Sequence, residues 1–118
     1  MTSRENRKQQ MDQYAIIVAD RDGVITLWSK GAERLIGHSA AEAVGRKLDL
    51  IVPQEFRAQH WHGFGRVMSG APASSAGQFF DLPVQCRGET KTLRGQLHVL
   101  RSEGSDAIGA MAIFSADA

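Results

Sequence analysis

The chain has 118 residues, of which 42% are hydrophobic and 23% are charged, and 14 Lys and Arg against 13 Asp and Glu give a formal net charge of +1. This size accommodates one domain with a single hydrophobic core, and the composition is that of a globular protein, which excludes a disordered or fibrous chain. The nearly balanced charge provides no electrostatic footprint for nucleic acid or an anionic membrane, so neither is expected as a partner.

The termini and the cysteine content indicate a cytoplasmic protein. Cys86 is the single cysteine, which excludes an internal disulfide and a cysteine-based zinc site. Residues 1–12 are polar and lack the apolar segment of a signal peptide. No later run approaches the ~18 apolar residues of a spanning helix. We expect residues 1–12 to form a leader that can be helical, followed by one domain over residues 13–115.

The first predicted element is a β-hairpin over residues 15–28. Two short runs rich in β-branched and aromatic residues flank Asp22 and Gly23, a dipeptide that favours a tight turn. The segment that follows reads as short helical pieces, one of which begins at Ser39 as the N-cap with Glu42 completing a capping box. Pieces this short are expected to cover a sheet.

One longer helix is predicted over residues 53–68, because Pro53 suits a first helical turn and Ser69 and Gly70 end the pattern. Its apolar stripe, at positions i, i+4, i+8 and i+11, consists of Phe56, His60, Phe64 and Val67. His60 is therefore expected to face the core, and His62 to face water.

Three strands are predicted after a small connector at residues 71–77. One face of the strand at 79–86 carries Phe80, Leu82, Val84 and Cys86, and one face of the strand at 92–100 carries Leu93, Leu97 and Val99. Residues 107–114 close the chain. Two strands, helices and then three strands imply an α+β domain, with one antiparallel sheet that carries its helices on a single face.

The sequences DRDGVITLWSKGAERLIGHSAAEAVGRKLDLIVP and PQEFRAQHWHGFGRVMSG, followed by the closing hairpin, have the order and spacing of a PAS domain, which the chain resembles over residues 13–115. The resemblance implies a sensory module of bacterial signalling proteins, with a five-stranded antiparallel sheet, short helices and one longer helix over a cavity. It implies no enzymatic activity. Its output would run through contacts with another signalling protein or with a second copy in a homodimer.

The longer helix also resembles that of the haem-binding FixL-type and Dos-type sensor PAS domains. Their pattern of Pro, two residues, an aromatic residue or Leu, Arg, two residues and His is matched by Pro53, Phe56, Arg57 and His60. The resemblance implies that His60 ligates the iron of a b-type haem, which detects O2, CO, NO or a redox change. A neutral imidazole nitrogen suits ferrous iron and leaves a position open for gas.

A haem pocket needs apolar walls with cations near the propionates. Arg57 or Arg66 could bind the propionates. The expected apolar lining is Phe56, Phe64, Val67, Phe80, Leu82, Leu97, Val99, Met111 and Ile113. An ungapped count places Phe80 where the FixL-type and Dos-type sensors carry a distal Arg, so the oxygen-specific hydrogen bond is not implied here. Gln78 falls at the distal Met position, where it could donate a hydrogen bond to a bound gas.

Several alternatives remain open on the residues alone. A lone histidine on an apolar helix face is commonly a hydrogen-bonded core residue. The chain could then be a cofactor-free PAS dimerisation or interaction module, or a sensor of a small organic metabolite. Flavin is a further alternative cofactor, although Cys86 lacks the sequence context of a flavin-adduct thiol and reads as a small buried hydrophobe. His60 and His62 lie two positions apart and so cannot share a metal on a helix.

Overall fold

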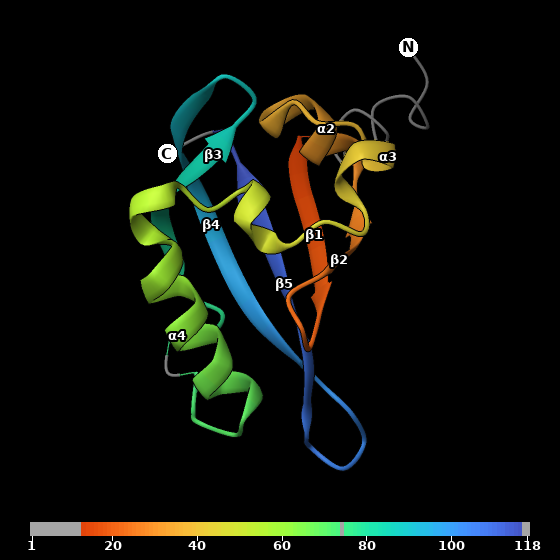
Figure 1. Ribbon diagram of the computed structural model, residues 1–118, viewed down its shortest axis with the longest axis vertical. Helices are drawn as coiled ribbons and strands as arrows, with labels where there is room; N and C mark the ends of the chain where they lie inside the picture. The colour runs from red at the N-terminus through yellow and green to blue at the C-terminus, as the bar shows by residue number, and fades with distance from the viewer. Residues whose placement is uncertain (1–12, 74, 117–118) are drawn as a thin grey trace.

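The computed structural model describes residues 13–73 and 75–116, and it is built on one five-stranded antiparallel sheet (Figure 1). The strands lie in the spatial order β2-β1-β5-β4-β3. Their bounds are β1 Tyr14–Asp20, β2 Ile25–Trp28, β3 Phe79–Cys86, β4 Glu89–Arg101 and β5 Ala107–Ser115. The predicted α+β class and antiparallel sheet are confirmed. The expected leader at residues 1–12 lies outside the described residues.

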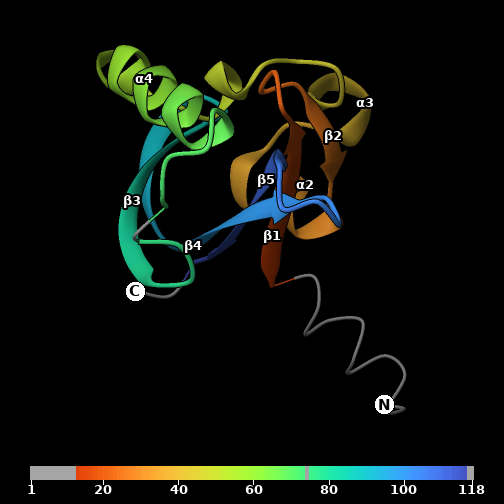
Figure 2. The same cartoon turned by 90° about the horizontal axis from the view of Figure 1, so that it is seen from below.

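The helices cover one face of the sheet, which we call the inner face, and α4 lies over the side formed by β3 and β4 (Figure 2). Their bounds are α2 Lys30–Ile36, α3 Ala40–Ala43, the 3-10 turns η1 Leu48–Leu50 and η2 Gln54–Phe56, and α4 Arg57–Met68. The predicted capping box is present at the start of α3, where Ser39 and Glu42 cap each other. None of the helices in the described ranges is long and apolar enough to cross a membrane.

The longer helix predicted over residues 53–68 is confirmed, and its first turn is a 3-10 turn. Residues Gln54–Phe56 form the 3-10 turn η2, and the α-helix begins at Arg57. The N–H of Phe56 donates to the carbonyl of Pro53, and the N–H of Arg57 donates to the carbonyl of Gln54. These bonds span three residues instead of four, which tightens the chain after the proline. Phe56 therefore precedes the α-helical register that was expected to carry it.

The turn between β1 and β2 is fitted to α4. Gly23 has a φ of 77°, and a Cβ built there would collide with the indole ring of Trp61. The Asp20 carboxylate accepts hydrogen bonds from the backbone N–H groups of Asp22 and Val24, which closes the turn. Glycine is thus required at position 23 both for the left-handed backbone and for the close approach of α4.

The core lies between the inner face of the sheet and the short helices. In β1 every second side chain is buried, namely Ala15, Ile17 and Ala19, as expected for a strand with one covered face. The largest buried partners are Ile25, Trp28, Ile36, Leu48, Ile51, Val84, Leu93 and Phe114. Below α4 the sheet is less completely covered, because Phe80 remains 37% exposed and Leu97 43% exposed.

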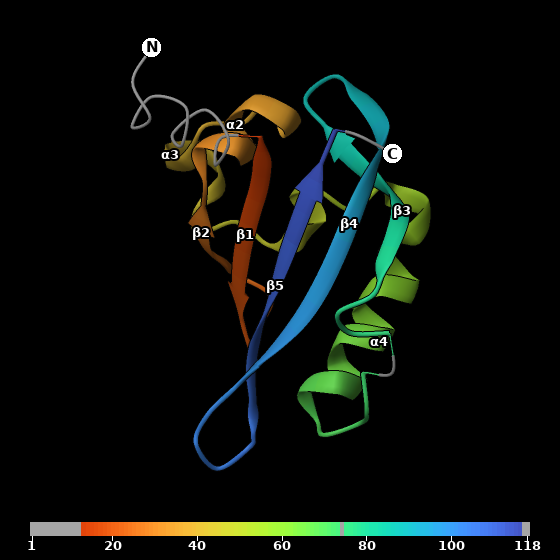
Figure 3. The ribbon, with the colours of Figure 1, turned by 180° about the vertical axis from the view of Figure 1, so that it is seen from behind.

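The other face of the sheet, which we call the outer face, carries no helix in the described part of the chain (Figure 3). The strand register places Ile16 opposite Ile113, and Val18 between Leu27 and Met111, on this face. Leu27 is 46% exposed. The outer face therefore carries apolar side chains at its centre.

Candidate functional site

His60 stands at the centre of an aromatic cluster on α4. Its ring centroid lies 4.9 Å from that of Trp61 and 5.8 Å from that of Phe64, and the Trp61 and Phe64 rings are 5.5 Å apart. Both Trp61 and Phe64 pack against the core. The side of α4 that faces the sheet therefore contains His60, as the helical period predicts.

The imidazole of His60 has a buried nitrogen without a partner. Its Nδ1 atom is buried and makes no hydrogen bond with any residue in the described ranges. Burial lowers the pKa of His60, while the negative charge of Asp49 acts in the opposite direction. A buried ring nitrogen without a hydrogen bond costs free energy unless something binds it, which makes His60 the strongest candidate ligand on α4.

Without a ligand, the protein is expected to lose stability as the pH falls below 6.5, the ordinary pKa of histidine. Because the pKa of His60 is lower in the folded state, the unfolded chain takes up a proton first as the pH falls through this window. Above the window both states are neutral and His60 contributes no pH dependence. Urea denaturation of the haem-free wild type and of His60→Leu from about pH 5 to about pH 8 measures this. The variant should lose less stability than the wild type on acidification. A difference in the free energy of unfolding between the two proteins that is constant with pH would contradict the burial of His60.

Two side chains attach the start of α4 to η1. The indole Nε1 of Trp61 donates to Oδ1 of Asp49 over 2.6 Å. The guanidinium of Arg57 donates to the carbonyls of Val52 and Asp49, at 3.1 and 3.2 Å. Asp49 thus accepts from both residues and fixes the position of α4, and with it that of His60.

The end of α4 is attached to the hairpin turn, and the connector that follows the helix is attached to the sheet. Arg21 donates from Nη2 to the carbonyl of Met68. Gln96 on β4 donates from Nε2 to the carbonyl of Gly77, while the N–H of Gly77 donates to the carbonyl of Leu97. The long helix is therefore held at both ends.

Four of the predicted wall residues share the inner face with α4. Phe80 pairs with Gly95, Leu82 with Leu93, Leu97 with Ala112 and Val99 with Ala110, and all of these lie on the inner face by their register with buried neighbours. On the helix itself Phe64 and Val67 are half-buried, whereas Phe56 is exposed. The position of Phe80, Leu82, Leu97 and Val99 on the inner face is consistent with the predicted lining, while their role as a lining stays a prediction.

The prediction that Met111 and Ile113 line the same pocket is wrong. Met111 pairs with Val18 and His98, and Ile113 pairs with Ile16 and Gln96, all on the outer face. The inner face of β5 instead carries Ala110, Ala112 and Phe114, which pair with the buried Ala19, Ile17 and Ala15. Strands alternate sides at every residue, so Met111 and Ile113 point away from His60.

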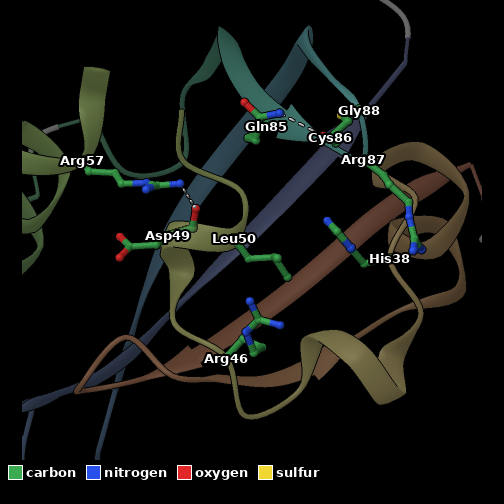
Figure 4. Close-up of a pocket in the computed structure, with 9 residues that line it drawn as sticks. All are labelled: His38, Arg46, Asp49, Leu50, Arg57, Gln85, Cys86, Arg87 and Gly88. Atoms are coloured by element: carbon green, nitrogen blue, oxygen red, sulfur yellow. Dashed lines mark hydrogen bonds between the residues drawn. The ribbon is translucent and has the colours of Figure 1, made fainter. Parts of the chain in front are cut away.

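An open cavity of about 440 Å³ lies beside the start of α4, and its lining does not include His60 (Figure 4). Its walls come from the segments around His38 and Arg46, from η1, and from the end of β3. Arg57 on α4 and Arg87 after β3 add two further cations. The sequence analysis did not predict this cavity, because the residues that form it are far apart along the chain.

Cys86 lines this cavity but is not suited to nucleophilic chemistry. Its side chain is buried, its Sγ lies 3.6 Å from the carbonyl oxygen of Val84, and burial raises the pKa of the thiol. The reactive thiolate is therefore disfavoured at neutral pH. The expectation that Cys86 is a small buried hydrophobe is confirmed.

The surroundings of His60 offer one nitrogen ligand and apolar surface. The Nδ1 atom of His60 is buried without a partner, and Phe80 and Leu97 on the inner face of the sheet are incompletely covered. No group of three or more His, Cys, Asp or Glu in the described ranges could hold a free metal ion. An iron porphyrin needs a single protein ligand, whereas a free metal ion needs several.

Comparison with known proteins identifies the family of this fold. The family model described as "PAS fold" matches residues 10–116. The sensor protein FixL of Bradyrhizobium diazoefficiens is 44% identical over 46 residues, which are 39% of this chain and 9% of that protein. The matched part thus spans a small fraction of that relative.

Among solved structures, the PAS domain of a Colwellia psychrerythraea protein has a TM-score of 0.74 at 21% identity and covers 98% of both chains. The PAS domain of the Cronobacter turicensis quorum-sensing receptor RpfR, in complex with C12:0, has a TM-score of 0.66 at 12% identity, with 90% of this chain and 95% of that chain covered. The PAS domain of Bordetella pertussis BvgS has a TM-score of 0.65 at 16% identity, with 99% and 88% covered. At these identities the likeness establishes the fold alone.

Proposed function

Because the chain belongs to the PAS fold family, we propose that it is a sensor domain that binds a b-type haem through His60 and signals through contacts with another protein. PAS domains serve in general as sensory and interaction modules, so no catalytic role is assigned to the chain. The signal would be a diatomic gas, O2, CO or NO, or a change in the redox state of the iron. The setting we propose is the cytoplasm.

The observation that carries the proposal is the unpartnered Nδ1 atom of His60. Burial keeps the ring neutral, as a metal ligand must be. The partial identity to the sensor protein FixL supports the same assignment. The iron of a bound haem would supply one coordination position for His60 and another for a small gas.

The remaining side chains would hold the macrocycle and exclude water. Phe64 on α4, with Phe80 and Leu97 on the sheet, would provide apolar surface for the macrocycle. Arg57 keeps N–H groups beyond those bonded to the carbonyls of Val52 and Asp49, so it can also bind a propionate. The exposed Arg66 is the second candidate for a propionate contact.

The signal would leave through the sheet. A shift of α4 acts on Trp61, which touches both Asp49 in η1 and the hairpin turn at Gly23. That turn joins β1 and β2, whose outer face presents Leu27 and Val18. We propose that this face contacts another signalling protein or a second copy of the chain. Such a mechanism requires two conformations with different affinities for the sensed ligand.

A cofactor-free interaction module is the second candidate function. It is favoured by the exposed apolar side chains of the outer face, Tyr14, Leu27 and Phe79, which suit a protein partner. In this case the ring of His60 would be a core residue, and the surfaces below α4 would close without a ligand. The two candidates differ in whether the protein takes up haem.

The test is a hemin titration of the purified protein, followed by reduction with dithionite and addition of carbon monoxide. We expect a Soret band that saturates at one haem per chain and shifts when carbon monoxide binds to the reduced protein. Hen egg-white lysozyme at the same concentration controls for non-specific uptake of hemin. A titration without saturation, or a spectrum equal to that of free hemin, would contradict haem binding and leave the interaction module as the function.

A further inference from the structure

We propose that α4 contains a hinge at Gly63 and Gly65, and that the helix opens at this hinge to admit haem to the space between α4 and the inner face of the sheet. The two glycines lie in the middle of the helix, with Phe64 between them. The identity of the ligand rests on the proposed function, whereas the hinge itself is tested in haem-free protein.

The Nδ1 atom of His60 is buried, so a ligand cannot reach it in this conformation. An iron atom can approach the ring only after the surrounding side chains move. One of these side chains is Phe64, whose ring centroid lies 5.8 Å from that of His60 and which packs against the core. Because Phe64 stands between the two glycines, a break in the helix at this point would displace a neighbour of His60.

Glycine is required at neither position by the surrounding structure. A Cβ built at Gly63 or at Gly65 meets no atom within 4 Å in the described part of the chain, and both residues are exposed. At Gly23, in contrast, the added atom would collide with Trp61. Neither Gly63 nor Gly65 has a positive φ, so the backbone there is open to other residues. Alanine would therefore fit at both positions without strain.

The two glycines weaken the middle of α4. Relative to alanine, each glycine in a helix interior favours the unfolded form of the helix about fivefold. The helix also begins without a side-chain cap, because Phe56 at the N-cap position makes no such hydrogen bond, and its first turn has no acidic residue. A helix of 12 residues with these features depends on tertiary contacts for its stability.

The side-chain hydrogen bonds that hold α4 lie on either side of the glycines. In the first half, Arg57 and Trp61 donate to η1. At the end of the helix, Met68 is buried and its carbonyl accepts from Arg21. Between them, no side-chain hydrogen bond or ion pair joins residues 62–67 to any other residue that the structure describes. The helix is therefore fixed at its two ends and can break between them.

The sheet below α4 is incompletely covered, since Phe80 and Leu97 remain exposed in part. The helices α2 and α3 lie on the side of β1 and β2, away from α4 (Figure 2). Opening of α4 would therefore expose the inner face beside β3 and β4 and leave the core under the short helices closed. Elements that admit ligands are drawn from the least stable parts of a fold.

Native-state hydrogen exchange of the haem-free full chain tests the hinge. In the wild type, the amides of residues 63–68 should exchange faster than those of β1 and β5, because they exchange through local opening and not through global unfolding. In the double variant Gly63→Ala, Gly65→Ala, they should exchange about 20-fold more slowly than in the wild type, equivalent to ~1.8 kcal/mol.

The matched control is Ala58→Gly, which places a glycine at an exposed position in the first half of the same helix. If α4 opens at the hinge, this change should leave the exchange of residues 63–68 as it is in the wild type. If α4 instead unwinds as a whole, the exchange of these residues becomes about fivefold faster, which would contradict a hinge at Gly63 and Gly65.

The kinetics of hemin binding test the role of the hinge in entry. Stopped-flow absorption measures uptake, and transfer of hemin to apomyoglobin measures release. Both rates should fall about 20-fold in the double variant while the affinity stays unchanged, because alanine stabilises the closed helix equally in the free and the loaded protein.

The hinge is wrong if the double variant leaves the exchange of residues 63–68 unchanged, or if these amides exchange in the wild type no faster than those of β1 and β5. Slower exchange with unchanged rates of hemin uptake and release would overturn its role in entry. A protein that takes up no hemin would contradict both the proposed function and entry through the hinge, while the exchange result would still decide whether the hinge exists. The two failures are therefore distinguished.

Discussion

His60→Ala is expected to remove the Soret band that hemin produces in the wild-type protein, and to weaken hemin binding about 100-fold, equivalent to ~2.7 kcal/mol. The reason is that His60 is the one side chain on the packed side of α4 with a buried nitrogen available for the iron. Alanine keeps helical propensity, so the helix should remain folded. Hemin titration of both proteins, followed by absorption, measures the effect.

The matched control for this variant is His62→Ala. His62 lies two residues further along α4 and is exposed, so its removal deletes an imidazole from the same helix without touching the inner face. It should bind hemin with the affinity of the wild type. If His60→Ala retains the Soret band, or if both variants lose it equally, ligation by His60 is wrong. Circular dichroism of each variant distinguishes a lost ligand from a lost fold.

Trp61→Ala is expected to reduce the free energy of unfolding by about 2–4 kcal/mol, somewhat below the range for a fully buried tryptophan because Trp61 is half-buried. The ring packs on the core and on the backbone of Gly23, and its N–H donates to Asp49 over 2.6 Å. Urea denaturation measures the loss. Hydrogen exchange should show the loss of protection concentrated in α4. The other side-chain hydrogen bonds that attach this helix are those of Arg57 and Arg21 to backbone carbonyls.

Trp61→Phe separates the two contributions of this side chain. Phenylalanine keeps most of the ring contact and removes the donor to Asp49, so the loss should be about 1–2 kcal/mol. If Trp61→Ala reduces the free energy of unfolding by less than about 1 kcal/mol, or leaves the exchange protection of α4 unchanged, the helix is positioned by other contacts.

The strands and turns that have a clear local signal could be predicted from the sequence. Asp22 and Gly23 form the predicted turn, and the alternation in β1 and β3 matches the buried positions. The placement of His60 on the packed side of α4 followed from helical spacing. Each of these features depends on residues close together in the chain, which is why a pattern can indicate them.

β5 shows why the rest could not be predicted. Its run of apolar residues has no alternation, so the sequence does not indicate which side of the strand faces inward. The register decides it: Phe114 lies opposite Gly95, and its ring occupies the space that a side chain at Gly95 would need. Met111 and Ile113, which alternate with Ala110, Ala112 and Phe114, consequently lie on the outer face.

The cavity beside η1 and the link from Trp61 to Asp49 depend on the tertiary fold. Arg46 and Arg87 line the same cavity because the segment before η1 and the end of β3 converge, and no local pattern contains that information. The hydrogen-bond partner of Trp61, Asp49 in η1, is twelve positions away in sequence. Contacts between separate elements are therefore what the structure adds to the sequence.

The most direct test of the central claim is the resonance Raman spectrum of the reduced, haem-loaded protein, with and without nitrogen-15 labelling of histidine. If His60 ligates the iron, an iron–histidine stretching band shifts to lower frequency on labelling and is absent in His60→Ala. A spectrum without a label-sensitive band, or a band that persists in His60→Ala, would contradict the assignment of His60 as the haem ligand.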